Sequence, residues 1–207
     1  MTREEFAALT DVSRETLERF EIWRRLLEEW SAHTNLVARS TLPDFWSRHA
    51  YDSFQLVDHV PDAARRCADI GAGAGFPGLA IAFALMARNP GEARVYLIES
   101  IGKKARFLQA VADATDAPVE VLPIRSEAVD PALTVDIVTA RAVAALPKLL
   151  TICKPLLKTG TLALFLKGAR YEEELTEARK YWSFDAEVIP SLTGDGAILK
   201  LETIAHV

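Results

Sequence analysis

The sequence predicts an α/β domain in which helices cover a mostly parallel sheet that closes with an antiparallel hairpin, preceded by a helical extension. After residue 66, short apolar runs alternate with helical patterns, which is typical of a parallel sheet. The last two apolar runs are joined by the turn-rich link "PSLTGDG", which is too short for a helix and therefore predicts an antiparallel pair. We expect a helical extension over residues 1–60 and a main domain over residues 61–207, together forming one compact unit.

The N-terminal extension has the apolar spacing of helices. From Ser13 onward, apolar side chains recur every three or four residues, and Ser13 with Thr16 offers start signals. A second helix is expected from about Pro43 to Val57, with Thr41 as its N-cap. The polar stretch "HTNLVARS" between the two helices predicts a loop.

Seven apolar runs predict the strands of the main domain. The parallel strands are expected at Cys67–Ile70, Val95–Ile98, Val119–Leu122, Val135–Thr139 and Thr161–Leu166, and the hairpin at Ala186–Ile189 and Ala197–Leu201. Helices are expected between them at Leu79–Met86, Lys103–Ala114, Leu146–Leu157 and Tyr171–Tyr181. A seven-stranded sheet with an antiparallel last hairpin differs from the standard dehydrogenase layout. It looks like the Rossmann-like fold of class I methyltransferases that use S-adenosylmethionine.

The composition argues against several other classes of protein. The N-terminus "MTREEFAALT" is charged and lacks the apolar region of a signal peptide, and no run of about 18 apolar residues predicts a membrane span. The net charge of −5 argues against a histone-like basic arm. Cys67 and Cys153 lie far apart without metal-ligand spacing. We therefore expect packing cysteines, a reduced cytoplasmic setting and no metal site.

The stretch "DIGAGAGFPG", Asp69–Gly78, follows the first predicted strand and is either a simple turn or a cradle for a nucleotide-like ligand. Gly71, Gly73 and Gly75 stand at every second position, where glycine permits a positive φ and a close approach of backbone to ligand. The dehydrogenase fingerprint G-x-G-x-x-G begins only at Gly73. The alternating glycines after Asp69 have the methyltransferase form, and an acidic residue suits a cationic, amino-acid-bearing cofactor better than a pyrophosphate.

Three further positions follow the ends of later strands. Glu99 ends the second strand, where a carboxylate can accept both hydrogen bonds of a ribose diol. Ser126 and Glu127 follow the third strand, where an adenine edge would lie, although Ser126 alone also reads as a helix N-cap. Arg141 follows the strand beside the first one, at the crevice where such sheets bind ligands.

The whole pattern resembles the RsmG (GidB) family of bacterial 16S ribosomal RNA guanine-N7 methyltransferases, over nearly the full chain. The motifs that carry the resemblance are "NLV" at Asn35–Val37, "SRHAYDS" at Ser47–Ser53, "DIGAGAGFPG" at Asp69–Gly78, "LIESIGKKARFL" at Leu97–Leu108, "RSEA" at Arg125–Ala128, "TARAVA" at Thr139–Ala144 and "LKG" at Leu166–Gly168. A typical member has "NLT" where this chain has "NLV", so the chain lacks one hydroxyl there.

The resemblance implies S-adenosyl-L-methionine as cofactor and assigns roles to individual residues. It implies cofactor contacts at Gly71, Phe76, Ser126, Glu127 and Arg141, beside Gly73 of the loop; Glu99 matches the ribose-binding acid of the wider class. Arg48, His49 and Asp52 match an N-terminal motif that folds over the cofactor site. We expect Arg141 and His49 to be catalytic.

The motifs of this sequence agree with methylation of guanine N7, the reaction that the resemblance implies. Guanine N7 has an in-plane lone pair, so its attack on a sulfonium methyl needs alignment rather than a strong base. The Asn/Asp-Pro-Pro-aromatic clamp of exocyclic-amine methyltransferases is absent, and neither cysteine ends a strand as a nucleophile would.

The charge distribution favours an RNA substrate. Residues 100–170 carry ten basic and six acidic side chains within an acidic chain. The candidates for phosphate contacts are Lys103, Lys104, Arg106, Lys148, Lys154, Lys158, Lys167 and Arg170, although each one taken alone is more simply explained as part of a solvated helix face. We expect 16S ribosomal RNA or the small-subunit particle as partner, no membrane, and a monomer.

Three other functions remain open from sequence. A methyltransferase could act on another RNA, a small molecule or a protein; the fold could serve a nicotinamide-dependent oxidoreductase; or it could have become a non-catalytic RNA-binding module. The alternating glycines and the closing hairpin argue against the oxidoreductase, and the intact loop, Glu99 and Arg141 argue against a decayed site.

Overall fold

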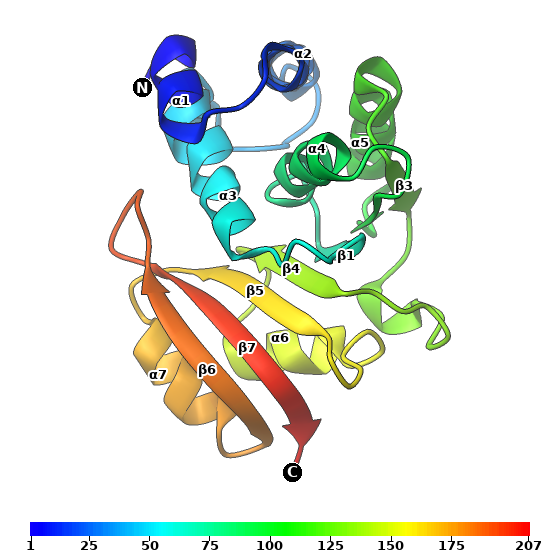
Figure 1. Ribbon diagram of the computed structural model, residues 1–207, viewed down its shortest axis with the longest axis vertical. Helices are drawn as coiled ribbons and strands as arrows, with labels where there is room; N and C mark the ends of the chain where they lie inside the picture. The colour runs from blue at the N-terminus through cyan, green and yellow to red at the C-terminus, as the bar shows by residue number, and fades with distance from the viewer.

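The computed structural model describes residues 1–207 and has a single seven-stranded sheet between two layers of helices (Figure 1). The strands lie in the order β3-β2-β1-β4-β5-β7-β6. They are β1 Arg66–Ile70, β2 Arg94–Ile98, β3 Val119–Leu122, β4 Ile137–Arg141, β5 Leu162–Lys167, β6 Trp182–Pro190 and β7 Ala197–His206. Strands β1 to β5 pair in parallel, and β7 runs antiparallel to both β5 and β6. The predicted fold class and closing hairpin are therefore confirmed, and β7 is the one reversed strand.

The helices divide between the two faces of the sheet (Figure 1). On one face lie α4 Gly78–Arg88 and α5 Gly102–Thr115, with α2 Arg14–Ser31 packed over both. The first helix, α1 Arg3–Thr10, packs against the helical segment that precedes β1. On the other face lie α6 Leu146–Cys153 and α7 Tyr171–Ala178, both of which end earlier than predicted. None of the helices combines the length and the apolar character that a bilayer crossing requires.

The N-terminal extension shares a hydrophobic core with the main domain. A cluster of 36 buried residues contains Phe6 and Phe20 of the first two helices together with Phe83 of α4. The ring centroid of Phe20 lies 5.0 Å from that of Phe6 and 5.2 Å from that of Phe83. Burial of such rings contributes roughly 1.5–3 kcal/mol each, so the extension is packed as part of the core. The division at residue 60 stays a prediction.

The segment before β1 is helical but not the single α-helix that the sequence predicts. It consists of the 3₁₀ turn η1 Arg39–Asp44, the π-helical η2 Phe45–Tyr51, the short α3 Asp52–Phe54 and the 3₁₀ turn η3 Gln55–His59. Pro43 has no N–H to donate within a regular helix. Thr41 is not the N-cap, because its hydroxyl donates to the carbonyl oxygen of Ala38. Ser13, by contrast, caps α2 as predicted by accepting from the Thr16 N–H.

The loop between β6 and β7, residues 191–196, packs closely against the end of β5. Its ends are joined by a hydrogen bond from the Ser191 N–H to the Gly196 carbonyl oxygen. A Cβ on Gly196 would lie 2.1 Å from the carbonyl oxygen of Lys167, so only glycine permits this approach of the two backbones.

We expect Gly196→Ala to lower the free energy of unfolding by roughly 1–3 kcal/mol, because the added methyl group collides with backbone. For a chain of this length the melting temperature should fall by about 2–4 °C per kcal/mol. Gly194→Ala is the matched control in the same loop, because a Cβ there meets nothing within 4 Å. Equal melting temperatures for the two variants would contradict the close contact.

Candidate active site

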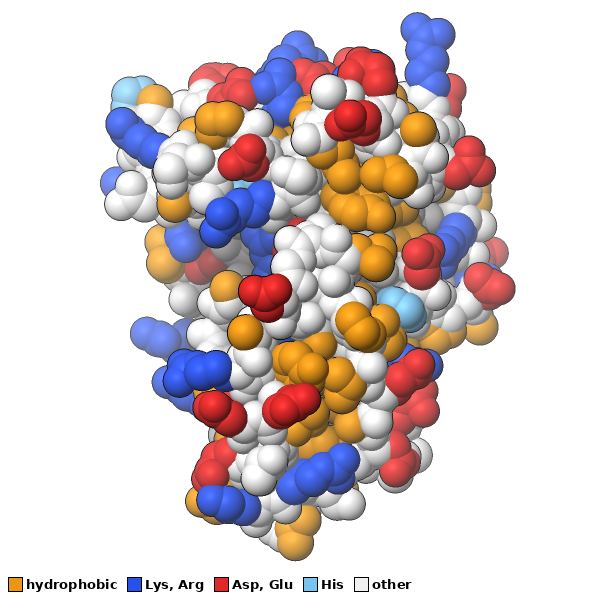
Figure 2. All heavy atoms as spheres, turned by 90° about the vertical axis from the view of Figure 1, so that its left-hand side faces the viewer, with side chains coloured by type: hydrophobic (Ala, Val, Ile, Leu, Met, Phe, Trp, Pro, Cys, Tyr) orange, Lys and Arg blue, Asp and Glu red, His pale blue; other side chains and the backbone are white.

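A cavity of about 1310 Å³ opens at the edge of the sheet where the parallel strands end. The segment from Val37 to Asp52 lines it on one side. The other walls are residues 141–144, which begin with the last residue of β4, residues 166–168 at the end of β5, the β6–β7 loop, Met1 and Glu174. Figure 2 shows this face of the molecule, with Lys and Arg side chains gathered beside the recess. The walls thus come from segments far apart in the sequence.

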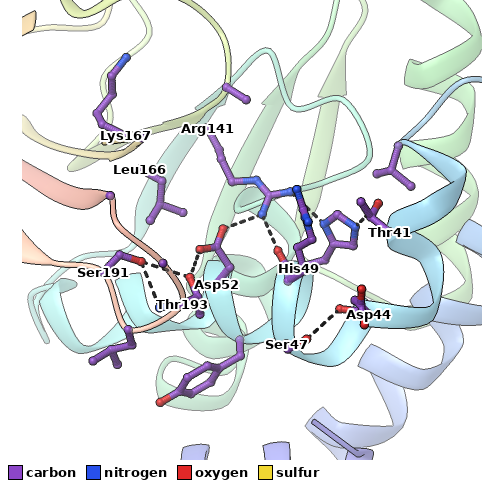
Figure 3. Close-up of a pocket in the computed structure, with 18 of the residues that line it drawn as sticks. Thr41, Asp44, Ser47, His49, Asp52, Arg141, Leu166, Lys167, Ser191 and Thr193 are labelled. Atoms are coloured by element: carbon purple, nitrogen blue, oxygen red, sulfur yellow. Dashed lines mark hydrogen bonds and ion pairs between the residues drawn. The ribbon is translucent and has the colours of Figure 1, made fainter. Parts of the chain in front are cut away.

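Arg141 is held in this cavity by three acceptors from one short stretch of chain. Its Nη1 donates to Asp52 Oδ2 at 2.7 Å and to the Arg48 carbonyl oxygen at 3.2 Å, and its Nη2 lies 3.1 Å from His49 Nδ1 (Figure 3). The Arg141 and Asp52 side chains are each only 19% exposed, so the pair is shielded from water. A guanidinium has five N–H donors, and the Nε–H and one Nη2–H of Arg141 remain without a partner.

His49 is a buried, neutral side chain with a fixed tautomer. The Thr41 hydroxyl already donates to Ala38, so it accepts from His49 Nε2–H at 2.9 Å, and His49 Nδ1 accepts from Arg141. Burial lowers the pKa of His49 from 6.5 to about 4, and the nearby charges of Arg141 and Arg48 act in the same direction. Both ring nitrogens are used inside the protein, so His49 orients Arg141.

Phe76 connects this cluster to the glycine loop. Its ring stacks with His49, with centroids 4.8 Å apart, and with Trp23 of α2, with centroids 4.4 Å apart. The Arg141 guanidinium carbon lies 4.9 Å from the centre of the Phe76 ring, a cation–π contact. Trp23 also donates from Nε1 to the Ala74 carbonyl oxygen at 3.0 Å. The predicted cofactor residue Phe76 is therefore buried among aromatic rings and supports the loop.

Asp69 lies beneath the glycine loop and does not face a ligand, contrary to the role suggested by its position in the motif. It is fully buried, and its carboxylate accepts from the Gly78 N–H at 3.0 Å and from the Thr139 hydroxyl at 2.8 Å. Burial raises the pKa of Asp69 to about 7, while these two hydrogen bonds lower it in part. Asp69 ties β1 to the start of α4 and to the neighbouring strand β4.

Glu99 and Gly73 lie together at the end of β2, as a shared cofactor role requires. The Glu99 carboxylate accepts from the Gly73 N–H at 3.0 Å and from the Ile101 N–H at 2.8 Å. Gly73 has a φ of +57°, and a Cβ there would meet only the Gly71 carbonyl oxygen, at 3.7 Å. Each carboxylate oxygen keeps a free lone pair, so Glu99 could still accept from a ribose hydroxyl.

Ser126 and Glu127 form the 3₁₀ turn η4 Ser126–Ala128 after β3. Arg125 precedes the turn in the cap position, so Ser126 is not the N-cap that its sequence context suggested. Ser126 is buried and Glu127 is exposed. The backbone of Ser126 and the carboxylate of Glu127 stay candidates for an adenine contact.

The structure thus divides the predicted site residues into two groups. Arg141 and His49 line the cavity, while Gly71, Gly73, Glu99, Ser126 and Glu127 lie outside its lining. The groups touch where Gly71 meets Val143, since a Cβ on Gly71 would lie 3.0 Å from Val143 Cγ2. Sequence reasoning missed Thr41, Gln55 and Thr193, which hold the cavity wall through hydrogen bonds that no local motif signals.

The predicted phosphate-binding residues differ in whether their charged groups are free to bind RNA. Lys167 is tied to Glu174, at 2.6 Å, and to the Ala144 carbonyl oxygen, at 2.7 Å, so its ammonium group is engaged within the fold. The other seven predicted residues form no ion pair, and all of them except the half-buried Lys104 are exposed. Arg48, which the sequence analysis did not propose for RNA binding, is also exposed and lines the cavity.

No group of three His, Cys, Asp or Glu side chains is placed to hold a metal ion.

We expect the stability contributed by neutral His49 to be lost as the pH falls from about 6.5 to about 4, because in this window the unfolded chain binds a proton at His49 and the folded chain does not. The slope from this group approaches about 1.4 kcal/mol per pH unit. Asp69 has the opposite effect on stability. Because its pKa is raised to about 7 in the folded protein, the folded carboxyl binds its proton before the unfolded one does, so this group adds to the free energy of unfolding as the pH falls below about 7.

Comparison with His49→Asn isolates the histidine, because Asp69 is common to both proteins. In urea unfolding, the wild type should lose unfolding free energy relative to the variant as the pH falls from about 7 to about 5. Parallel pH profiles of the two proteins would contradict a neutral, buried His49.

Comparison with known proteins identifies the family. The family model "rRNA small subunit methyltransferase G" (GidB) matches residues 16–196. The ribosomal RNA small subunit methyltransferase G of Parvibaculum lavamentivorans is 46% identical over 200 residues, covering 96% of this chain and 88% of the relative. The protein of the same name from Hyphomonas neptunium is 45% identical over 205 residues, covering 99% and 96%.

Solved structures of other methyltransferases share the fold. An O-methyltransferase from Bacillus cereus in complex with SAH has a TM-score of 0.55 at 16% identity and covers 98% of this chain and 100% of that one. Fibrillarin from Aeropyrum pernix with bound S-adenosyl-L-methionine has a TM-score of 0.56 at 15% identity and covers 75% of each chain. The sheet order, the family match over most of the chain and the full-length relatives confirm what the sequence predicted: the chain belongs to the rRNA small subunit methyltransferase G family of S-adenosylmethionine-dependent methyltransferases.

Proposed function

We propose that this protein transfers a methyl group from S-adenosylmethionine to N7 of a guanine in 16S ribosomal RNA, as naked RNA or within the small-subunit particle. The observation that carries the proposal is Arg141, which is fixed at the end of β4 by three acceptors and keeps two N–H donors free beside a large cavity. We propose that the protein acts as a monomer. We propose a cytoplasmic location, which an rRNA substrate supports.

The cofactor fits the residues around the glycine loop. Gly73 leaves room for close approach of a ligand, and the nearly buried carboxylate of Glu99 is oriented by two backbone N–H groups and keeps lone pairs for a ribose diol. The free donors of Arg141 suit the methionine carboxylate of the cofactor, or a phosphate of the target nucleotide. When bound, S-adenosylmethionine supplies an electrophilic methyl group on sulfonium.

The protein's part in this reaction is alignment. Guanine N7 is nucleophilic without loss of a proton, and His49 is not available as a base, because both of its ring nitrogens are engaged. His49 is therefore proposed as a positioning residue. It fixes Arg141, which in turn fixes the reacting partners, and correct placement of two reactants lowers a barrier substantially.

An RNA substrate fits the cavity better than a small molecule does. Small-molecule sites measure roughly 300–1,000 Å³, and this cavity is larger and open to solvent on the face shown in Figure 2. An exposed cation lies on its wall at Arg48, and the exposed Arg170 follows Gly168 of the lining by two residues in the sequence. Such charges suit the phosphates of a nucleic acid.

Arg141→Lys tests the role of the guanidinium. The variant keeps the positive charge next to Asp52 but loses the fork of donors, so methyl transfer should fall by at least about tenfold, or about 1.4 kcal/mol of barrier. The melting temperature should change by no more than a few degrees. Methylation at the wild-type rate with saturating cofactor and RNA would remove Arg141 from the reaction centre.

Lys103 and Lys104 test the electrostatic part of RNA binding. Both begin α5, directly after Glu99 and at the sheet edge that carries the site. Replacing both by Ala should weaken RNA binding and reduce its salt dependence by about one unit of slope for each phosphate that the protein no longer neutralises. Lys154 and Lys158 form the matched control, because they lie between α6 and β5 at the opposite edge of the sheet. Equal salt slopes for the two double variants would mark Lys103 and Lys104 as a solvated face.

A further inference from the structure

The β6–β7 loop presents an exposed apolar side chain on the wall of the cavity. Leu192 is 65% exposed, and it belongs to the cavity lining. Single exposed leucines are common on protein surfaces and need no special role. Leu192 differs from such residues in how firmly its backbone is held.

Gln55 holds the loop from the N-terminal segment. This buried residue, 4% exposed, uses both ends of its amide: Oε1 accepts from the Leu192 N–H at 2.9 Å, and Nε2 donates to Ser191 Oγ at 3.3 Å. The Thr193 hydroxyl donates to Asp52 Oδ1. The residues on both sides of Leu192 are therefore bonded to the segment that also holds Arg141.

The same carboxylate joins the loop to the reaction centre. Asp52 accepts from Thr193 with Oδ1 and from Arg141 with Oδ2, so one side chain connects the loop to the end of β4 (Figure 3). On its other side the loop is fixed to β5 by the close approach of Gly196 to Lys167. Leu192 thus has a backbone position set relative to Arg141 and a side chain that nothing in the chain buries. Such preorganisation lowers the entropic cost of binding.

The location of Leu192 indicates which ligand it meets. Every predicted cofactor residue except Arg141 lies outside the cavity lining. We therefore assign the part of the cavity beyond Arg141 to the substrate. Proteins recognise single-stranded RNA through unstacked bases that pack on side chains, and enzymes that modify a base take it out of its stack. Leucine is among the apolar side chains that nucleic-acid-binding proteins place against bases.

We propose that Leu192 packs against the target base as it enters the cavity, and so contributes to RNA binding and not to cofactor binding. This inference rests on the proposed function, since it assigns a residue to the RNA side of that site. The contact would replace part of the stacking that the base loses when it leaves its neighbours, at a point held rigidly to Arg141 through Asp52.

Steady-state methylation of small-subunit RNA by Leu192→Ala tests the inference. We expect kcat/KM for RNA to fall by about tenfold, mainly through KM, while S-adenosylmethionine affinity by calorimetry and the melting temperature stay at the wild-type values. Leu192→Met, which keeps an apolar side chain of similar size, should recover most of the activity. Leu9→Ala is the matched control, because Leu9 is 60% exposed on α1 and lies outside the cavity lining.

An unchanged kcat/KM for Leu192→Ala, beside an active wild type, overturns this inference and leaves the proposed function standing. An equal loss in Leu9→Ala, or a parallel loss of S-adenosylmethionine affinity in Leu192→Ala, also overturns it. A wild-type protein that methylates neither 16S ribosomal RNA nor the small-subunit particle contradicts the proposed function, and this inference with it.

Discussion

The positive charge of Arg141 sets the arrangement of the whole site. A guanidinium that is largely removed from water at a strand end must find acceptors, because an unpaired buried charge costs several kcal/mol. The parallel sheet cannot supply them, since its own carbonyl groups are used between strands. All three acceptors come instead from residues 48–52, so the segment before the first strand must fold back over the end of β4. The N-terminal extension is thereby built into the site.

A chain of contacts through His49 and two aromatic side chains connects Arg141 to the glycine loop and to α2. His49 can accept from Arg141 only while it is unprotonated, and its second nitrogen is fixed by Thr41. The imidazole stacks on Phe76, and Phe76 stacks on Trp23, which holds the glycine loop by a hydrogen bond to Ala74. The helix α2 therefore supports both the loop predicted to hold the cofactor and the arginine predicted to orient the reactants. We therefore expect a substitution of any of these rings to affect both.

Local sequence patterns were enough to predict the fold, whereas the arrangement of the site depends on contacts between residues that are far apart in the sequence. The alternation of strands and helices and the short link after Pro190 were enough to predict the sheet and its closing hairpin, because burial enforces periodicity in every element. The same reasoning placed Arg141 correctly at a strand end. It gave Thr41 and Asp69 the wrong roles, since a hydroxyl or carboxylate in a suitable motif can bond elsewhere once the chain is folded. The hydrogen bond from Leu192 to Gln55 joins residues 137 positions apart, and no local signal predicts it.

The side chains that hold Arg141 are themselves fully engaged. Every strongly polar group close to Arg141 is engaged in holding it: both oxygens of Asp52, both nitrogens of His49 and the hydroxyl of Thr41. A site that had to remove a proton from its substrate would need one of these groups free. Methylation of guanine N7 removes none, so the chain can use all of them for rigidity. What remains available is two N–H donors on an immobile guanidinium, which is suited to fixing an anionic group in place. A reaction that needs only alignment therefore permits a site in which the side chains around Arg141 are all used to hold it.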